Sequence, residues 1–500
     1  MKILLFCHHA QIREYAKYIN AFKKTNLVQS LFLTMGRDEY ELGQELGAFD
    51  VVKDILPGKR ELDAADEDPT IASGSLKALE NRIGSVFVNR DILMDRFFRG
   101  QPTLNVDSKS FPLIWTGSRT KQFMYLISRR LEEEIRSFDP DFMFVETSVA
   151  PNRMAWRLAR EKGVPAGGFM SVRFWPERLY LETGIGYDWN EARVAYSEMT
   201  DSPMIGAELT KVEQRLQTIR EKHTKPAYLQ TEHAKGAPGF LKRLYALWAF
   251  SGGHGSWLGR RARTFEEDPQ VLPRKIYSPY AKYIRYRNGL KAKRYLLRHQ
   301  THFDKFRTKQ YAIYFLHVQP EMTVEGMAFD YQDQVDTIRN ILAALPADMN
   351  LIVKEHTPML GYRPIEVYDQ LAHMPGLIIA DTHEDSHQLI THASVVVTLT
   401  GTVALEALLY GIPAIVLGSI YFDGFNGIYK PKSLGDLKEL MANPEKLPGA
   451  TDEDALRALG SLLRASQPGK PSRVDVTAEE IDDDSAKVMM SELKRTCRLA

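Results

Sequence analysis

The chain has 500 residues, of which 44% are hydrophobic and 26% are charged, as in ordinary globular domains. This composition excludes a disordered or collagen-like chain, and the two cysteines exclude a disulfide scaffold and a cysteine-rich metal site. The formal net charge is +1, but residues 231–310 contain 18 Lys and Arg against 5 Asp and Glu, so this block carries +13 and the rest of the chain −12.

No apolar run approaches the roughly 20 residues of a transmembrane helix. The apolar stretch at the N-terminus is too short for a signal peptide. Two cysteines also suit a reducing compartment. We therefore expect a cytoplasmic protein that is at most peripheral on the inner membrane.

Strand-like and helix-like segments alternate over the first 200 residues. Lys2–Phe6 and Val28–Thr34 are short apolar runs typical of buried strands, and Arg13–Lys24 has the apolar spacing of a helix. The pattern resumes with a helix predicted over Lys121–Phe138 and a strand predicted over Phe142–Val145. Such alternation predicts a parallel sheet with crossover helices.

The alternation breaks over a helix-rich, basic stretch and returns near residue 311. The strands expected there are Tyr311–Leu316, Leu351–Lys354, Leu377–Ile379, Val395–Leu399 and Ala414–Leu417. The fold class predicted for the whole chain is therefore α/β, with two Rossmann-like doubly wound domains and a helical insert between them.

The expected domains are an N-terminal domain over residues 1–200, a basic and aromatic helical insert over 201–310, a C-terminal domain over 311–470, and an acidic stretch with a helix over 471–500. Ligands of doubly wound sheets bind in the crevice at the carboxyl ends of the strands. We therefore expect the site between the two α/β domains.

The strand Val395–Leu399 runs into Thr400-Gly401-Thr402, where a helix is predicted to start. The first N–H groups of a helix are unpaired and favour an anion, above all a phosphate. Gly401 allows close backbone approach, and the two threonine hydroxyls add donors. Glu406, one turn further, is placed to accept hydrogen bonds from ribose hydroxyls. The alternative is a simple threonine-capped helix with a surface glutamate.

Polar residues also follow two other predicted strands. Lys354 and His356 end one strand, where an imidazole can bind a phosphate and stabilise its departure. Gln319 and Glu321 follow another strand, where they would contact a base or a sugar. Because carboxyl ends of parallel strands share one edge, we expect the His356 imidazole within about 10 Å of the Gly401 N–H. A solvated charged turn is the alternative for the Lys354–His356 segment.

The motifs HVQPE, LIVKEHTPMLGYR and LTGTVALEALLYGIPAIVLG follow one another within roughly residues 311–422. Together they resemble the capsule-polysaccharide and surface-carbohydrate biosynthesis proteins, which are GT-B glycosyltransferases and include the Kdo transferases of capsule assembly. This chain has Thr357 where that family has Pro, with Pro358 one residue later. The resemblance assigns the binding of a sugar nucleotide to Gln319, Glu321, Lys354, His356, Thr400, Gly401, Thr402 and Glu406.

Three residues are candidates for the catalytic base that takes a proton from the acceptor hydroxyl. Glu146 follows the strand Phe142–Val145 and would stand on the N-terminal side of the crevice. Its alternative role is to stabilise the start of the next helix. His8 and His9 end the first strand, and their alternative is a structural or exposed pair.

Two apparent metal motifs have the wrong context. His383-Glu384-Asp385-Ser386-His387 has the HExxH spacing of zinc proteases, but it is polar and lies at a predicted helix start. Asp139-Pro140-Asp141 resembles the DxD of another transferase class, but it precedes its strand and is typical of a helix stop. We therefore expect no metal and no cofactor.

The block from Gly239 to Arg307 interleaves basic and aromatic side chains, among them Lys242, Arg243, Tyr245, Trp248, Trp257, Arg260 and Arg261. This pattern suits a helix that lies on an anionic membrane surface. Ordinary solvated helices with core aromatics are the bland alternative, and nucleic-acid binding is a weaker one.

The sequence therefore predicts a metal-independent glycosyltransferase that moves a sugar from a nucleotide-sugar donor to a capsular or similar polysaccharide, presented as a polysaccharide or lipid-linked glycan. Glu146 would be the base, and no nucleic acid is expected as a partner. The alternatives are a sugar-nucleotide 2-epimerase of the same architecture and a non-catalytic capsule-assembly adaptor docked to a membrane.

Overall fold

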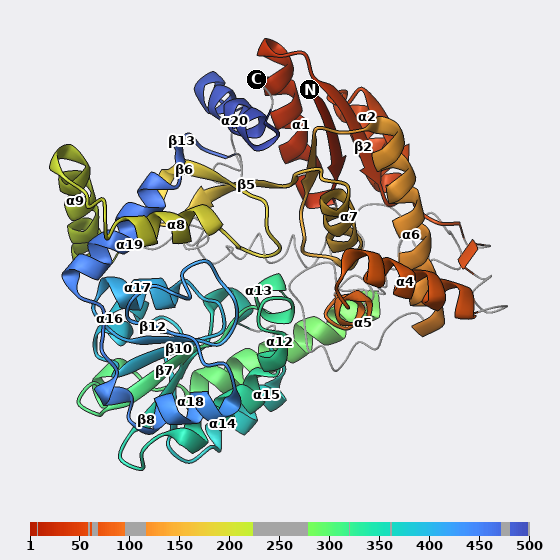
Figure 1. Cartoon of the computed structure of the whole chain (residues 1–500). Helices are drawn as coiled ribbons and strands as arrows, with labels where there is room; N and C mark the ends of the chain where they lie inside the picture. Colours follow the sequence, from red (N-terminus) through yellow and green to blue (C-terminus); the bar gives the residue numbers. More distant parts are fainter. Residues whose placement is uncertain are drawn as a thin grey trace, which may run out of the picture.

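The computed structural model describes residues 1–7, 9–58, 61–62, 69–95, 117–223, 279–319, 321–360, 363–471 and 481–498. These residues form two α/β halves, each built on one sheet (Figure 1). The two-domain α/β fold predicted from the sequence is confirmed.

The N-terminal sheet has the strand order β13-β6-β5-β4-β1-β2-β3. Its strands are β1 (Lys2–Phe6), β2 (Gln29–Thr34), β3 (Val51–Asp54), β4 (Phe142–Val145), β5 (Ala166–Val172), β6 (Trp175–Glu182) and β13 (Gln467–Pro468). The strands from β3 to β5 are parallel, whereas β6 and β13 are antiparallel additions. The parallel part reads 3-2-1-4-5, which is Rossmann-like, and its order reverses between β1 and β4.

Helices cover both faces of this sheet because alternate residues of β1 point to opposite sides. Leu4 and Phe6 pack in one core and Ile3 and Leu5 in the other. The helices of this half are α1 (His9–Thr25), α2 (Arg37–Leu46), α4 (Pro69–Ile83), α5 (Val88–Leu93), α6 (Gly117–Phe138) and α7 (Ala150–Glu161).

The C-terminal sheet has the order β12-β11-β10-β7-β8-β9, with every pairing parallel. Its strands are β7 (Tyr311–Phe315), β8 (Asn350–Lys354), β9 (Leu377–Ala380), β10 (Val395–Thr398), β11 (Ala414–Val416) and β12 (Ile428–Tyr429). In chain order this is 3-2-1-4-5-6, the Rossmann arrangement, which reverses between β7 and β10.

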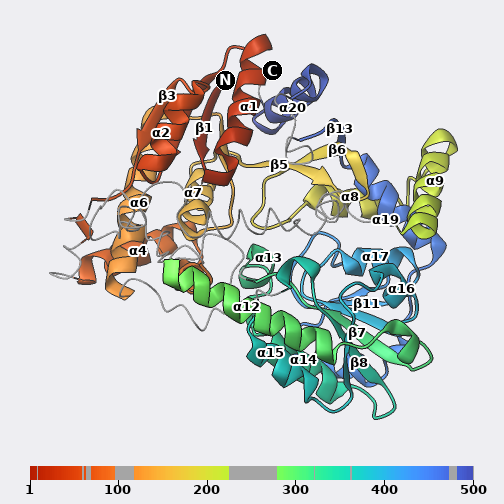
Figure 2. The ribbon, with the colours of Figure 1, turned by 180° about the vertical axis from the view of Figure 1, so that it is seen from behind.

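Helices also cover this second sheet. They are α12 (Pro279–His299), α13 (Met322–Glu325), α14 (Gln334–Ala344), α15 (Ile365–Ala372), α16 (Ser386–Thr391), α17 (Val403–Leu409) and α18 (Leu434–Ala442). Helix α12 runs along α15 on the side seen in Figure 2. No helix among the described residues is long and apolar enough to span a membrane.

The chain crosses back to the first half after α19 (Asp452–Arg464), which packs on α8 (Asn190–Glu198) and α9 (Gly206–Lys222). Strand β13 then pairs with β6, and α20 (Asp483–Thr496) lies beside α1 (Figure 1). The predicted C-terminal domain over residues 311–470 therefore ends too late, because its last strand belongs to the other sheet.

The basic block is described only in part. Between residues 201 and 310 the structure describes α9, α12 and a short 3-10 turn, Phe303–Lys305. The side chains on which the membrane prediction rests, from Lys242 to Arg261, lie outside the described residues. Membrane contact by this block remains a prediction.

Candidate functional site

A cavity of about 150 Å³ lies between the two halves, at the point where the N-terminal sheet reverses its order. One wall is the loop after β4, with Glu146, Thr147 and Ser148. The opposite wall comes from the C-terminal half, with Glu321 and Met322 at the start of α13. Of the residues predicted for the site, Glu146 and Glu321 line this cavity.

The described lining of this cavity is acidic. It contains Glu14, Glu146, Glu182 and Glu321, and none of its described side chains is Lys, Arg or His. An ionised carboxylate has two oxygens, and each of them accepts hydrogen bonds. A cavity with this lining suits a molecule rich in hydroxyl groups, and the negative charge of its glutamates repels an anion.

The backbone around Glu146 is held in place. The Asn152 side-chain amide donates to the Glu146 carbonyl oxygen at 2.7 Å, and the Ser148 hydroxyl donates to the Glu146 carboxylate. The alternative role of Glu146, to stabilise the start of α7 by its charge, remains a prediction. The N-cap of α7 is Val149, and no side chain caps the helix there.

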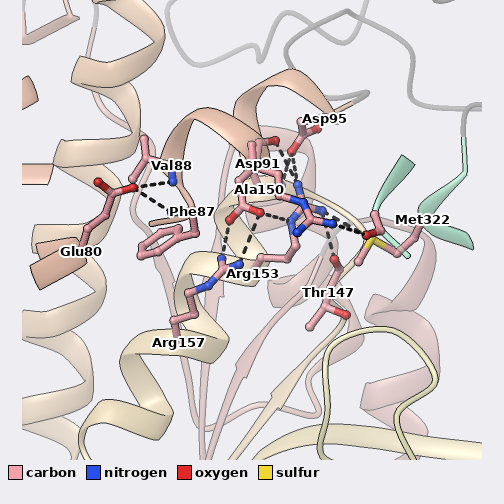
Figure 3. A network of polar contacts seen from close by, with 12 residues as sticks. Glu80, Phe87, Val88, Asp91, Asp95, Thr147, Ala150, Arg153, Arg157 and Met322 are labelled. Carbon is pink, nitrogen blue, oxygen red and sulfur yellow. Dashed lines mark hydrogen bonds and ion pairs between the residues drawn. The ribbon is translucent and has the colours of Figure 1, made fainter. Parts of the chain in front are cut away.

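A buried ion cluster lies directly behind this loop (Figure 3). Arg153 of α7 is fully buried, and its Nε donates to Asp91 of α5 at 2.9 Å. A terminal nitrogen lies 3.5 Å from Asp95. The other terminal nitrogen donates to the Thr147 carbonyl at 3.2 Å and contacts the Met322 sulfur at 3.8 Å. One guanidinium therefore connects the cavity loop with α13 of the other half.

Arg157 and Phe87 complete the cluster. Arg157 also pairs with Asp91, and its guanidinium lies 4.1 Å from the centre of the Phe87 ring. Burial lowers the pKa of Arg157, although the Asp91 charge opposes that shift. Two arginines and two aspartates balance one another, as buried charges require.

Strand ends of the C-terminal sheet meet at His317, the second residue after β7. Its Nε2 lies 3.0 Å from the Thr398 hydroxyl and 3.4 Å from the Thr400 backbone nitrogen, which donates to it. The Gly401 N–H donates to the Thr398 hydroxyl at 3.1 Å. A Cβ at Gly401 would lie 3.2 Å from the His317 ring and 2.6 Å from the Thr398 hydroxyl, so this turn needs glycine.

Two further side chains fix the His317 backbone. Gln334 accepts from the His317 N–H at 2.8 Å and donates to its carbonyl at 3.2 Å. Arg363 donates to the same carbonyl at 2.8 Å and pairs with the fully buried Glu355 at 2.7 Å. Tyr368 donates to Glu355 at 2.7 Å. The glutamate of the Lys354-Glu355-His356 motif is thus an internal anchor.

His356 is neutral at pH 7, because burial lowers its pKa to about 4 and nearby Lys354 and Arg363 add to that shift. Burial also lowers the pKa of His317 to about 3, with a contribution from His356. The two imidazoles are therefore close enough to act on one another. Among the described residues, His356 Nδ1 is buried and has no hydrogen-bond partner.

The other predicted donor-site residues are placed as follows. Thr400 is buried and donates to the Thr323 carbonyl at 2.9 Å, so the turn touches the wall of the cavity. Thr402 is the N-cap of α17, and Glu406 is buried one turn later. The contact of these two residues with a phosphate and a ribose remains a prediction.

Gln319 and Lys354 are engaged inside the C-terminal half. The Gln319 amide donates to Glu325 and to the Gln332 carbonyl, each at 2.9 Å. The Lys354 ammonium group is buried and donates to the Thr382 carbonyl at 3.0 Å. In the described conformation both side chains hold loops, and their contact with a sugar nucleotide remains a prediction.

The histidines at the first strand's end are only partly described. His9 is the first residue of α1, and nothing of its side chain is described, while His8 lies outside the described residues. The role of either as a base stays a prediction.

The HExxH segment does not converge on a metal in the described residues. The His383 side chain is 70% exposed and lies 3.2 Å from Asp381. His387 is fully buried, with Nδ1 3.0 Å from the Tyr410 hydroxyl, and Glu384 accepts from the Phe303 N–H. No group of three His, Cys, Asp or Glu side chains with metal-site geometry occurs within the described part of the chain.

Three residues of the site region were missed by sequence reasoning. His317 belongs to the quoted HVQPE motif, and its place at a strand end was a usable signal. Asp91 and Arg153 gave no such signal. Asp91 lies on the short helix α5, and Arg153 lies inside α7, whose sequence has an ordinary pattern of charged residues.

The C-terminal half resembles a known protein family. The model of the family described as "Capsule polysaccharide biosynthesis protein" matches residues 273–456. No curated protein matches the chain. Among solved structures, the β-Kdo 2,4 transferase KpsC of Thermosulfurimonas dismutans is 14% identical, with a TM-score of 0.36 over 70% of this chain and 86% of its own.

A putative UDP-N-acetylglucosamine 2-epimerase of Listeria monocytogenes is 12% identical, with a TM-score of 0.27 over 99% of this chain and 96% of its own. At such distances neither likeness bears on activity. The family match covers β7 to β12 and therefore the whole C-terminal sheet. Over these residues the chain matches the capsule polysaccharide biosynthesis protein family, which its motifs also resemble.

Proposed function

We propose that the protein is a GT-B glycosyltransferase that moves a sugar from a nucleotide-sugar donor to a capsular or similar surface polysaccharide. The observation that carries this proposal is the acidic cavity between two Rossmann-like halves. The capsule-biosynthesis family match over the C-terminal sheet supports the same substrate class.

In this proposal Glu146 is the general base. It would accept the proton of the acceptor hydroxyl as that oxygen attacks the anomeric carbon of the donor sugar. The acidic cavity would bind the hydroxyl groups of the acceptor, and the hydrogen bonds of Asn152 and Ser148 would hold the base in place.

The donor phosphate would lie at the turn Thr400–Thr402, with His356 as a further contact through its buried Nδ1, which has no hydrogen-bond partner among the described residues. At pH 7 a neutral imidazole donates one hydrogen bond to an oxyanion and keeps its proton. The transfer is proposed to need no metal and no cofactor. The acceptor would be a polysaccharide or a lipid-linked glycan.

The first test is binding and turnover by the full chain. We expect a thermal shift with one class among CMP-, UDP- and GDP-sugars, and transfer of that sugar to an oligosaccharide acceptor. Glu146→Gln should lower kcat about 10²- to 10⁴-fold with unchanged donor binding. Glu133→Gln, on the exposed face of α6, is the control.

Two outcomes would replace the proposal. Conversion of the nucleotide sugar into its 2-epimer without any acceptor would make the protein an epimerase. Absence of binding to every nucleotide sugar would favour a non-catalytic adaptor in capsule assembly.

A further inference from the structure

A second cavity of about 350 Å³ adjoins the acidic one and is lined from both halves of the molecule. Gly186, Tyr187 and Met322 line both cavities, so the two spaces share a wall. The second cavity is also lined by Arg90 of α5 and by Lys430, the residue that follows β12. It is therefore a continuation of the same crevice toward the C-terminal sheet.

The two cavities have opposite charge. The described lining of the first contains four glutamates and no cation, whereas the second contains three cations, Arg90, Arg193 and Lys430, against Asp188 and Asp423. An anion entering this crevice is repelled on one side and attracted on the other.

Two of the three cations already have carboxylate partners. Lys430 lies 2.6 Å from Asp423, and Arg193 pairs with Asp188 and lies 3.8 Å from Asp423. These ion pairs connect the loop after β11 with α8. They also neutralise most of the charge of Lys430 and Arg193.

Arg90 differs from them. Its guanidinium donates to the Gly326 carbonyl at 3.3 Å and lies 5.3 Å from the centre of the Phe329 ring. No carboxylate among the described residues forms an ion pair with it. A guanidinium has five N–H donors, so most of its hydrogen-bonding capacity remains for a ligand.

The backbone that carries Arg90 is supported by the residue next to it. Its neighbour Asp91 is fixed by Arg153 and Arg157 in the buried cluster behind the cavity loop (Figure 3). A cation on a fixed helix can select a charged group by position as well as by charge.

We propose that this second cavity is a subsite for an oxyanion of the substrate, with Arg90 as its main donor. The proposal rests on the proposed transferase function and adds a charge requirement to it. A substrate would place hydroxyl groups toward the four glutamates and an anionic group toward Arg90.

That oxyanion has two sources of the same chemistry: a phosphate of the nucleotide sugar besides the one proposed at the Thr400–Thr402 turn, or the carboxylate of an acidic sugar in the glycan. Both bind a guanidinium through paired hydrogen bonds. The experiment therefore uses CMP and UDP for the first source, and glucuronate for the second, with neutral glucose as a reference.

The variants are Arg90→Gln and Arg90→Lys in the full chain, with Lys77→Gln on the exposed face of α4 as the control. We expect Arg90→Gln to weaken binding of either the nucleotides or glucuronate about 10- to 100-fold, the range for one hydrogen-bonded charge. Arg90→Lys should recover part of that affinity, and Lys77→Gln and the glucose reference should not change. Thermal unfolding of each variant checks that it is folded.

The outcomes separate this subsite from the transferase proposal. Nucleotide binding that Arg90→Gln leaves intact, with no glucuronate binding, would overturn the subsite but not the transferase. Glucuronate binding that depends on Arg90, in a protein that binds no nucleotide sugar, would overturn the transferase but not the subsite. A wild-type protein that binds none of the anionic probes would overturn the subsite.

Discussion

The two sides of the crevice use polar residues at strand ends in different ways. After β4 in the N-terminal half, Glu146 lines the cavity, and the ions that support its loop lie behind it on helices. After β7, β8 and β10 in the C-terminal half, polar side chains bond mainly to one another, as with Gln334 to His317 and Arg363 to Glu355.

This difference separates two functions of a polar residue at a strand end. In the first function the side chain contacts a ligand directly. In the second it fixes the loop whose other groups contact the ligand. His317 illustrates the second, because its ring holds the turn before α17 and its backbone is held by Gln334 and Arg363. Substitutions at the supporting residues of each side test how far the two sides depend on their buried ion pairs.

The largest effect is expected at Arg153, the centre of the N-terminal cluster. Arg153→Met keeps most of the volume but leaves Asp91 and Asp95 buried with less compensation. Breaking a buried pair from one side costs about 3–5 kcal/mol. Urea unfolding should show a loss of this size, with Arg160→Met on the exposed side of α7 as the control.

Arg153→Met should also lower kcat more than it changes donor affinity, because the Thr147 carbonyl loses its anchor while the C-terminal sheet is untouched. A free energy of unfolding within about 1 kcal/mol of the wild type would show that the cluster is not the support we describe.

A smaller loss is expected at Glu355 in the C-terminal half. Glu355→Gln keeps an acceptor oxygen for Tyr368 but removes the charge that balances the buried Arg363. We expect a loss of about 2–3 kcal/mol in urea unfolding. Exposed Glu366→Gln on α15 is the control.

The same variant has a spectroscopic consequence. The Glu355 charge raises the pKa of His356, so its removal should lower that pKa below about 4. NMR titration of the imidazole measures this directly. An unchanged titration would show that the Glu355 charge does not act on the His356 imidazole.

Most strands and the doubly wound fold class could be predicted from the sequence, because buried parallel strands read as short apolar runs with helices between them. β4 was predicted residue for residue, and β7 to within one residue. β3 and β6 were missed. β3 is short and largely exposed, and β6 is an antiparallel addition that follows β5 directly, whereas the alternation predicted parallel strands with crossover helices.

The candidate site was less accessible to sequence reasoning. Residues at the ends of apolar strands can be found, as with Glu146 and His356. Whether such a side chain faces the crevice or bonds inward depends on partners far along the chain, as with Lys354 and the Thr382 carbonyl. Arg153 and Asp91 lie 62 positions apart in the sequence, so no local sequence pattern indicates that they form an ion pair.

The pH dependence of stability gives a third prediction. The pKa of His356 is about 4 in the folded chain, below the value near 6.5 of an unfolded histidine. As pH falls through 6.5 the unfolded state takes up the proton first, so stability is full above pH 6.5 and is lost as pH falls toward 4.

Between pH 7 and pH 5 this one histidine should cost about 2 kcal/mol. His356→Asn should remove that part of the pH dependence, while His373→Asn on the exposed end of α15 should leave it unchanged. Urea unfolding at both pH values measures the difference. Equal slopes in the wild type and His356→Asn would mean that the imidazole is protonated as easily in the folded chain as in the unfolded one.

The smallest effect is expected at Thr398, where the strand-end network is weakest. Thr398→Val keeps the shape but removes the hydroxyl that lies 3.0 Å from His317 and accepts from the Gly401 N–H at 3.1 Å. A loss of about 1 kcal/mol is expected, with exposed Thr391→Val as the control. Because Thr398 contacts the His317 ring and Arg363 contacts its carbonyl, Thr398→Val and Glu355→Gln share a partner. Their double variant should depart from additivity by at least about 0.5 kcal/mol, and closer agreement would show that the ring and the backbone of His317 are held independently.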